Sequence, residues 1–441
     1  MTLSILCGVF LLLLLLRVPV AYCIGLAALS AMLCTLPFDP SAMTIAQRTA
    51  TGVTSFTLLA IPFFVLAGKL IATGGAAARL IDFARVTVGF LPGGLAVTSV
   101  VSNMLMGSVS GSAAAAASGI GGFMIPSMER EGYPRAFGAA VTVSSATTGL
   151  LIPPSNVLIV YAMVASGVSI GALFVAGYLP GLILGAALMA TAMIIATRRG
   201  YGTRAPAPTP RAFATALWRV LPSLLLVVVV IGGIISGIFT ATEASAAAVL
   251  YSFVLGMWVY RDIRWRDLYR ILLETASTTG MVFLLIGTSM AMAWIFAYAD
   301  VPKLVDVFLR TVSTNPYVIL LLINIILLGV GTFMDMTPAV LIFTPIFLPI
   351  VQELAPAMGT TPELMKYQFG IIMVFNLSIG LCTPPVGTVL FIGAGVARLS
   401  ISEVARALVP FFLAMVVVLL LVVYAPAISL WLPRDVFGLL G

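Results

Sequence analysis

The chain has 441 residues, of which 61% are hydrophobic and 8% are charged, whereas a soluble domain carries about 25% charged residues. Its net charge of +7 requires no nucleic-acid partner, because membrane proteins collect basic residues in the loops on one side. Histidine is absent, the four cysteines lack metal-ligand spacing, and no P-loop motif occurs. These absences disfavour a membrane hydrolase and an ATP-driven pump. The composition predicts an all-α polytopic membrane protein that is not an enzyme.

Apolar runs of about 20 residues, the length that crosses a bilayer, recur along the whole chain. The first run has neither a basic flank nor a cleavage site, so we expect a retained helix and not a signal peptide. Residues 136–166 and 366–396 are each broken by a proline pair. The predicted crossings are residues 2–16, 19–37, 57–73, 136–166, 170–196, 217–238, 243–260, 278–298, 366–396 and 404–432.

Two further apolar stretches, residues 93–126 and 316–353, are interrupted near the middle by small and polar residues. Each stretch is too long for one crossing. Irregular backbone at membrane depth is tolerated only where protein buries it or where it lines a polar cavity. We therefore predict two re-entrant helical hairpins, with tips at residues 107–115 ("GSVSGSAAA") and 331–339 ("GTFMDMTPA").

The basic residues predict the orientation. Clusters at residues 197–211 and 261–270 are expected on the cytoplasmic side. This arrangement leaves 17 of the 22 lysines and arginines inside. The exceptions outside are Arg48, Lys303, Arg310, Lys366 and Arg434. Both termini are then expected on the periplasmic side of a bacterial inner membrane.

The chain repeats itself once. Asp82 and Asp306 are each followed 25 residues later by a glycine and a hydroxyl residue, then by a proline and by a Gly-x-x-x-Pro-Pro break. Ser169-Ile170 and Ser400-Ile401 follow the two breaks at equal distance. We predict repeats at residues 55–185 and 280–415, with scaffold at 1–54 and 186–279 and a C-terminal end at 416–441.

The two copies are predicted to be inverted in the membrane. Arg79 and Arg85 of the first copy fall on the cytoplasmic side, whereas Lys303 and Arg310 of the second copy fall on the opposite side. Inverted repeats allow a secondary transporter to exchange inward-open and outward-open states. The amphipathic segments 79–91 and 303–312, which precede the hairpins, are predicted to be arms that lie along the interface.

The proline-pair breaks predict cation sites. Proline removes amide donors and leaves carbonyl oxygens free, and helix ends and hydroxyl groups add further oxygens. Because a hairpin tip is expected to face a break in each of the two repeats, the sequence predicts two Na⁺ sites with a substrate nearby. Site 1 is expected at Ser108, Ser110, Gly111, Ser112, Gly149, Ile152 and Asn156. Site 2 is expected at Gly331, Thr332, Asp335, Thr337, Gly380, Thr383 and Thr388. The expected substrate contacts are Ser110, Pro154, Ser155, Asn156, Asp335, Pro385, Gly387 and Thr388.

Several motifs allow a second interpretation. Asp335 is a membrane-depth carboxylate, which is a functional candidate, but it could equally be a helix cap. Glu243 is expected to support the first turn of a helix. Ser169 fits G-x-S-x-G, which is not expected to be catalytic without a histidine. The glycines at 177, 181 and 185 predict close helix packing.

The segments "GSVSGSAAAAASGIGGFMIPSMEREGY", "GLLIPPSNVLIVYAMVASGVSIGALFVAGYLPG", "GTFMDMTPAVLIFTPIFLPI" and "FGIIMVFNLSIGLCTPPVGTVLFIGAGVA" resemble the large membrane subunit of tripartite ATP-independent periplasmic (TRAP) transporters. The resemblance implies an elevator-type, Na⁺-driven importer of small organic acids such as C4-dicarboxylates or sialic acids. It also implies a small four-helix membrane subunit, expected as a separate chain, and a periplasmic substrate-binding protein. The chain departs from the family at Ala116, where an acidic residue is frequent, so site 1 is expected to use neutral oxygens. The alternative is a stand-alone di- or tricarboxylate transporter of similar architecture.

The resemblance also implies a motion. Each hairpin tip is expected to stay packed on its break while the units at residues 93–166 and 316–396 move together. Residues 2–37, 57–73 and 217–260 would form the static scaffold, and the two arms would act as hinges.

Overall fold

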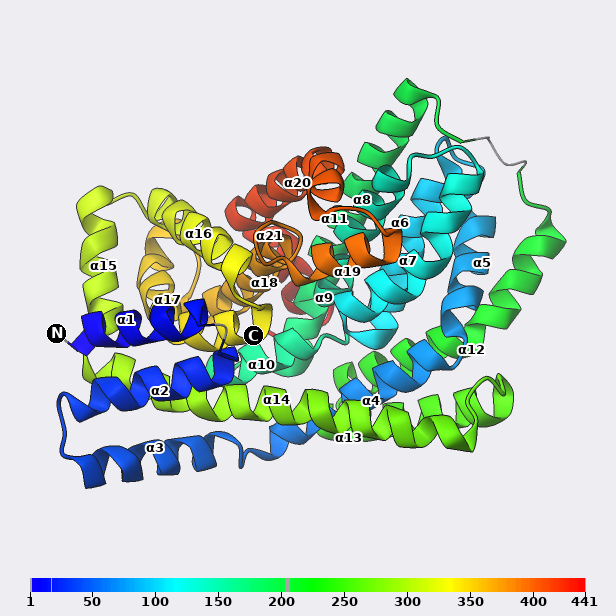
Figure 1. Ribbon diagram of the computed structural model, residues 1–441. Coiled ribbons are helices and arrows are strands. Elements are labelled where there is room, and N and C mark those ends of the chain that lie inside the picture. Colours follow the sequence, from blue (N-terminus) through cyan, green and yellow to red (C-terminus); the bar gives the residue numbers. More distant parts are fainter. Residues whose placement is uncertain (1, 17, 203–206, 441) are drawn as a thin grey trace.

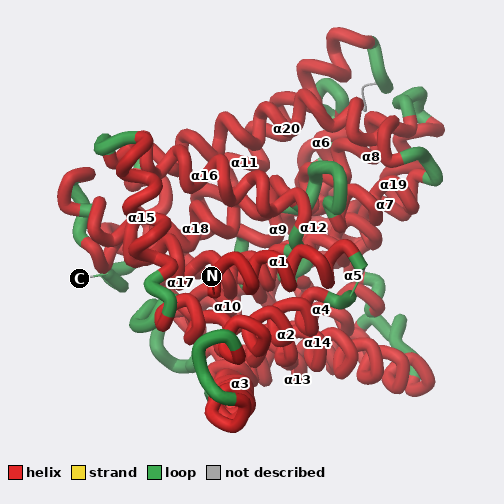
Figure 2. The backbone as a smooth tube through the Cα atoms, turned by 60° about the vertical axis from the view of Figure 1, so that its left-hand side comes forward, coloured by secondary structure: helices red, strands yellow, loops and turns green. Residues whose placement is uncertain are grey.

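The computed structural model describes residues 2–16, 18–202 and 207–440, and it contains helices and no strand within those residues (Figure 2). Eight of the described helices are long and apolar enough to cross a membrane, or nine if a pair bent by 46° counts as one span. Large apolar side chains face outward on these helices; Trp218 is 76% exposed and Val417 is 58% exposed. Such surfaces fit contact with lipid. The prediction of an all-α polytopic membrane protein is confirmed.

The helices outside the hairpins form one layer of the molecule. In Figure 1, α14 runs along the lower edge, with α3 beneath α2 on one side and α4 and α13 on the other. These elements are α1 (Thr2–Leu15), α2 (Val20–Leu33), α3 (Phe38–Gly52), η1 (Phe56–Leu59), α4 (Ala60–Thr73), α12 (Pro210–Ile235), α13 (Ala241–Val254), η2 (Leu255–Val259) and α14 (Trp265–Tyr298).

The other elements form two series with the same order: an arm, two hairpin limbs, a broken helix and a long helix. The first series is α5 (Ala76–Val88), α6 (Gly94–Ser110), α7 (Ala113–Arg130), α8 (Arg135–Ala146), α9 (Thr148–Leu151), α10 (Asn156–Val164) and α11 (Ile170–Arg199). The second is α15 (Val301–Val312), α16 (Pro316–Phe333), α17 (Met336–Leu354), η3 (Pro356–Met358), α18 (Pro362–Gly380), α19 (Thr388–Ala397) and α20 (Ile401–Tyr424). The chain ends with α21 (Pro426–Trp431) and η4 (Leu432–Val436).

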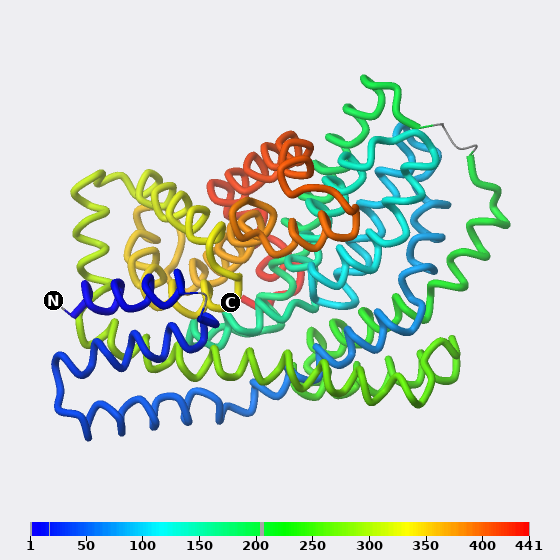
Figure 3. The backbone as a smooth tube through the Cα atoms, viewed as in Figure 1, coloured from blue at the N-terminus to red at the C-terminus, as the bar shows by residue number. Residues whose placement is uncertain are grey.

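The two hairpins lie at opposite ends of the molecule, with the broken helices between them, as the path in Figure 3 makes clear. The first break separates α9 from α10, and the second separates α18 from α19. Both proline pairs, Pro153-Pro154 and Pro384-Pro385, are joined by cis peptide bonds. Ser169 and Ser400 are the N-caps of α11 and α20, and each hydroxyl accepts a bond from a backbone amide three residues on. Ser169 therefore has the role of a helix cap.

Two local predictions are confirmed. Glu243 forms a capping box with Thr240 at the start of α13, where its carboxylate accepts a 2.8 Å bond from the Thr240 amide. The three spaced glycines of α11 lie in close contact with their neighbours: a Cβ on Gly181 would come within 2.5 Å of Ile152. Small residues at this spacing allow the broken helix to approach α11 closely.

The structure corrects several boundaries. The polar segment 38–52 forms α3, which was not predicted because it lacks a long apolar run. The basic segment 261–270 is not all loop, since α14 begins at Trp265. The crossing expected at 404–432 ends at Tyr424, before Pro426, and that expected at 19–37 ends at Leu33, before Pro37. Proline at these points cannot continue the helix. Part of the basic cluster at 197–211, residues 203–206, lies outside the described residues.

Candidate functional site

Each hairpin tip touches the proline-pair break of its own series. Gly111, at the first tip, has a φ of +62°, and a Cβ placed on it would lie 2.7 Å from the Pro154 carbonyl oxygen. At the second tip, the Val386 amide donates a 3.0 Å bond to the Thr332 carbonyl oxygen. Tip and break are thus in backbone contact in both series.

Pairs of glycines make this approach possible. A Cβ on Gly107 would collide with the Gly149 backbone, and a Cβ on Gly380 would lie 2.5 Å from the Gly331 carbonyl carbon. Each pair joins the first hairpin limb to the broken helix, just before the tip and just before the break. The glycines predicted as cation-site residues therefore serve close backbone packing.

In both series, buried asparagine side chains also join the first hairpin limb to the broken helix, on the N-terminal side of the paired glycines. The Asn103 Nδ2 donates a 2.8 Å bond to the Ser145 hydroxyl, and Asn103 is fully buried. In the second series the Asn376 Nδ2 donates to the Asn324 carbonyl oxygen at 2.8 Å and to its Oδ1 at 2.9 Å. Sequence reasoning missed these residues, whose signal was an asparagine inside an otherwise apolar helix.

Replacing Asn376 with alanine is expected to loosen the second hairpin. An interhelical hydrogen bond between membrane helices contributes about 0.6 kcal/mol on average and up to about 1.7, so losing two should cost about 1–2 kcal/mol. The unfolding midpoint in detergent should fall by a few degrees. Ser378→Ala is the matched control, because the Ser378 hydroxyl bonds only within its own helix, to Phe375. Equal midpoints for the two variants would show that the bonds between helices add nothing.

Both tips and both breaks meet at one cavity of about 250 Å³. The two series contribute residues from 111–114, 150–160, 335–337 and 381–389, while α4 and α14 form the opposite wall. Six predicted site residues line this cavity: Gly111, Ser112, Asn156, Asp335, Thr337 and Thr388. Segments separated by more than 200 positions in the sequence are thereby joined in one site.

Asp335 is the one charged residue among the described residues that line this cavity. It occupies the N-cap position of α17, yet its side chain makes no capping hydrogen bond. Its side chain remains accessible from the cavity. The carboxylate is placed to meet a ligand, which argues against the helix-cap interpretation.

The first break supplies oxygens without partners. Within the described part of the chain, the Asn156 Oδ1 and the Ser155 hydroxyl are buried and have no hydrogen-bond partner. A buried polar atom left unpaired costs about 1–3 kcal/mol, so a ligand at this position would restore a favourable interaction. Asn156 lines the cavity, whereas Ser155 is fully buried beside it.

The remaining predicted residues lie around the cavity and do not line it. The Ser108 and Thr383 hydroxyls each donate to a carbonyl oxygen three residues earlier, that of Leu105 and that of Gly380. Ser110 lines an adjoining cavity. The second break faces outward, so Pro385 is exposed, whereas the first break is buried. The predicted residues that line neither of these two cavities are Ser108, Gly149, Ile152, Pro154, Ser155, Gly331, Thr332, Gly380, Thr383, Pro385 and Gly387.

The adjoining cavity has a volume of about 430 Å³ and leads toward Lys69. The two cavities share Val65, Ser112, Ala114, Asn156 and Thr278 as lining residues, so they lie next to each other. Lys69 pairs with Glu274 at 3.5 Å, between α4 and α14. Sequence reasoning did not assign Lys69 or Thr278 to a site, because both lie in helices expected only to support it.

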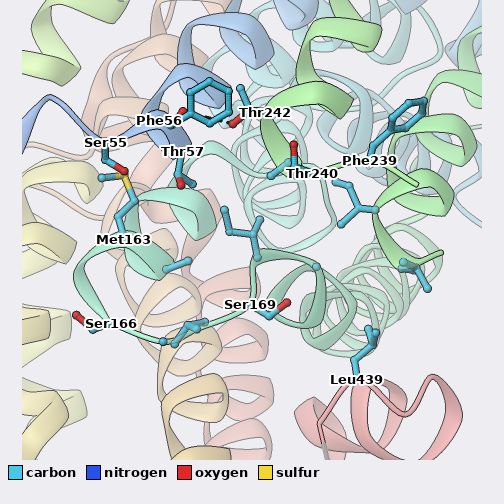
Figure 4. Close-up of a pocket in the computed structure, with 18 of the residues that line it drawn as sticks. Ser55, Phe56, Thr57, Met163, Ser166, Ser169, Phe239, Thr240, Thr242 and Leu439 are labelled. Carbon is cyan, nitrogen blue, oxygen red and sulfur yellow. Dashed lines mark hydrogen bonds between the residues drawn. The ribbon is translucent and has the colours of Figure 1, made fainter. Parts of the chain in front are cut away.

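A larger pocket of about 730 Å³ lies at the other end of α4 (Figure 4). Its labelled side chains come from the turn before α4 (Ser55), the loop after α10 (Ser166) and the α12–α13 turn (Thr240). It shares no lining residue with the cavity at Asp335. The site therefore adjoins the cavity at Lys69 and has no wall in common with the pocket in Figure 4.

Among the described residues, no three His, Cys, Asp or Glu side chains gather to hold a metal ion. The oxygens that converge at the tips and breaks are carbonyls, hydroxyls, one amide and one carboxylate. Such a set suits a weakly bound, hard cation rather than a structural zinc site.

Broken helices around a shared cavity, in an otherwise apolar helical protein, define a polytopic membrane transporter. Its fold is similar to the Alcanivorax borkumensis YdaH transporter, with a TM-score of 0.61 at 15% identity over 89% of this chain and 88% of that one. It is also similar to Neisseria gonorrhoeae MtrF, with a TM-score of 0.55 at 15% identity over 87% and 84%.

The family model of the tripartite ATP-independent periplasmic transporter, DctM component, matches residues 7–428, and the chain belongs to this family. It is 51% identical to the uncharacterized protein YgiK of Salmonella typhimurium, over 97% of this chain and 96% of that protein. It is 40% identical to the C4-dicarboxylate TRAP transporter large permease protein DctM of Pseudomonas aeruginosa, over 92% and 93%. It is 38% identical to the sialic acid TRAP transporter large permease protein SiaM of Vibrio cholerae, over 89% and 90%.

The chain is thus the large permease subunit of a secondary transporter for organic acids, and it is not an enzyme. The resemblance stated from the sequence is confirmed. Family membership also implies a small membrane subunit and a periplasmic substrate-binding protein as partners.

Proposed function

We propose that this subunit imports a small organic acid, of the C4-dicarboxylate or sialic acid kind, by symport with Na⁺ across a bacterial inner membrane. The small membrane subunit would be a separate chain, and a periplasmic binding protein would deliver the substrate to the side of the pocket in Figure 4. Both chain termini would lie on the periplasmic side.

One observation carries the proposal. The cavity joins two hairpin tips and two broken helices, and its charged lining residue is an acid, Asp335. An organic anion entering this cavity alone would be repelled, because charges interact strongly away from water. Na⁺ ions held by Asp335 and by the unpaired Asn156 oxygen would offset both negative charges. Binding of anion and cations would then be mutually favourable, which is the requirement for symport.

We further propose that this conformation is the inward-facing state. The site adjoins the cavity at Lys69, which precedes the basic arm containing Arg79 and Arg85, and these arginines are expected on the cytoplasmic side. This conformation would be inward-open, with the periplasmic pocket closed off. Lys69, which lines the adjoining cavity, would attract the departing carboxylate.

Uptake is expected to depend on a Na⁺ gradient. The experiment reconstitutes the large subunit with the small subunit in liposomes, supplies a purified binding protein and a panel of labelled organic acids, and varies the gradients independently. An inward Na⁺ gradient should drive uptake, and an inside-negative potential should accelerate it, since each net positive charge gains about 2.3 kcal/mol per 100 mV. Full uptake with a proton gradient and no Na⁺ would refute the coupling.

A further inference from the structure

A basic groove lies between the arm α5 and the first turns of α12, away from the transport cavity (Figure 1). It has a volume of about 390 Å³. Four arginines line it, Arg79, Arg85, Arg211 and Arg219, together with Asp82. The two helices meet at an aromatic contact in which the rings of Phe83 and Phe213 are 6.1 Å apart.

Two of the four arginines already have partners. Arg79 pairs with Asp262 at 2.9 Å and lies 3.7 Å above the Tyr260 ring, and Arg85 pairs with Glu131 at 3.3 Å. These contacts hold the two side chains in place on the arm.

The other two arginines are available. Arg211 and Arg219 are exposed on α12, and neither forms an ion pair with another described residue. Asp82 faces the same groove, and it too lacks an ion pair among the described residues. Among the described residues, the groove therefore offers two guanidinium groups without an ion pair, beside one carboxylate. Arginine recognises phosphate through paired, charge-assisted hydrogen bonds, and a carboxylate accepts bonds from hydroxyl groups.

The neighbouring side chains on α12 indicate how deep in the membrane this groove lies. Trp218 stands next to Arg219 and is 76% exposed, and Leu221, one turn further into the span, is 43% exposed. Exposed tryptophan is typical of the boundary between headgroups and acyl chains. The arginines therefore lie at headgroup level, and apolar side chains continue from them along α12.

We propose that this groove binds the headgroup of an anionic phospholipid that also carries hydroxyl groups, such as phosphatidylglycerol. Arg211 and Arg219 bind the phosphate, Asp82 accepts bonds from the glycerol hydroxyls, and the acyl chains lie along Trp218 and Leu225, which are exposed on the same face of α12 as Arg211. Basic pockets between membrane helices on the cytoplasmic side recognise anionic lipids in this way. The lipid bridges α12 and the arm α5, so it ties the hairpin series to the helix layer beneath it.

Native mass spectrometry of the detergent-purified chain tests the site with added phosphatidylglycerol or phosphatidylcholine. We expect the chain to retain bound phosphatidylglycerol. We expect the double variant Arg211→Gln/Arg219→Gln to bind this lipid about 30-fold more weakly, because each arginine contributes about 1 kcal/mol. Arg211→Lys/Arg219→Lys should keep most of the binding. Arg266→Gln is the control, because Arg266 is exposed on the first turn of α14 and does not line the groove.

Two results would overturn the proposal. The first is equal retention of phosphatidylglycerol by the parent and the double glutamine variant, measured on protein of equal monodispersity. The second comes from thermal unfolding: inorganic phosphate that raises the midpoint as much as the lipid would identify a soluble phosphate ligand instead. None of these measurements depends on transport, so the test of the lipid site is independent of the test of the proposed symport.

Discussion

Asp335→Asn is expected to raise the half-saturating Na⁺ concentration for uptake at least about tenfold. The substitution keeps the side-chain shape but removes the charged lining residue of the cavity. A charge 4 Å from a cation contributes about 4 kcal/mol at an effective dielectric constant near 20, and 1.4 kcal/mol already corresponds to tenfold in affinity. The measurement is initial uptake against Na⁺ concentration in proteoliposomes.

The comparison variant is Ser112→Ala, at the first tip. The Ser112 hydroxyl is neutral and also caps α7, by accepting a 3.3 Å bond from the Ala115 amide. Its removal should shift Na⁺ dependence by about threefold or less, with some loss of stability. Unchanged Na⁺ dependence in Asp335→Asn would mean that the carboxylate serves only the helix start.

Alanine at Gly107 or Gly380 is expected to abolish most uptake. In either variant the new Cβ would overlap the backbone of the facing glycine, Gly149 or Gly331. Backbone cannot rotate away as a side chain can, so the hairpin must separate from the broken helix. Overpacking of this kind costs about 1–3 kcal/mol or more, and the oxygens at tip and break would lose their alignment.

The matched controls are Gly119→Ala on α7 and Gly329→Ala on α16. A Cβ on either glycine meets nothing within 4 Å. Each control should keep near-parental uptake and gain slightly in helix stability, because alanine is the better helix former by about 1 kcal/mol. Similar losses in the controls and in the two test variants would show that helix flexibility, and not the glycine contact, is what uptake requires.

Much of the fold follows from sequence because membrane spans and breaks are local signals. The apolar runs predicted α4 and α11 within a few residues, and the small and polar residues that interrupt two long apolar stretches predicted both hairpins. Proline pairs locate breaks because they remove amide donors at a fixed position. The sequence did not predict α3, because this helix has little apolar content of its own. It packs against α14, where Gly52 lies close to Met290.

The site was only partly predictable for a different reason. Tips and breaks could be recognised, but which of their residues face the cavity depends on helix rotation. Pro385 was expected at the substrate, but it is exposed and does not line the cavity, whereas Asn156 and Thr388 do. Contributions from α4 and α14 could not be anticipated, because Lys69 and Thr278 reach the cavities only through the packing of distant helices.

The central claim is that tip and break travel together past a static helix layer. Two cysteine pairs in a background without the native cysteines test it. Thr332→Cys/Val386→Cys joins a tip to its break, where the backbones are linked by a 3.0 Å hydrogen bond. Val65→Cys/Ala114→Cys joins α4 to the first hairpin across the shared cavities.

Crosslinking rates with a short bifunctional thiol reagent are measured in membranes with and without Na⁺, substrate and the loaded binding protein. The account predicts that the pair at 332 and 386 crosslinks at the same rate in every condition and that uptake survives. It predicts that the rate for the pair at 65 and 114 changes at least several-fold and that this crosslink stops uptake. Loss of the tip-to-break crosslink in one condition, or continued uptake with residues 65 and 114 joined, would contradict it.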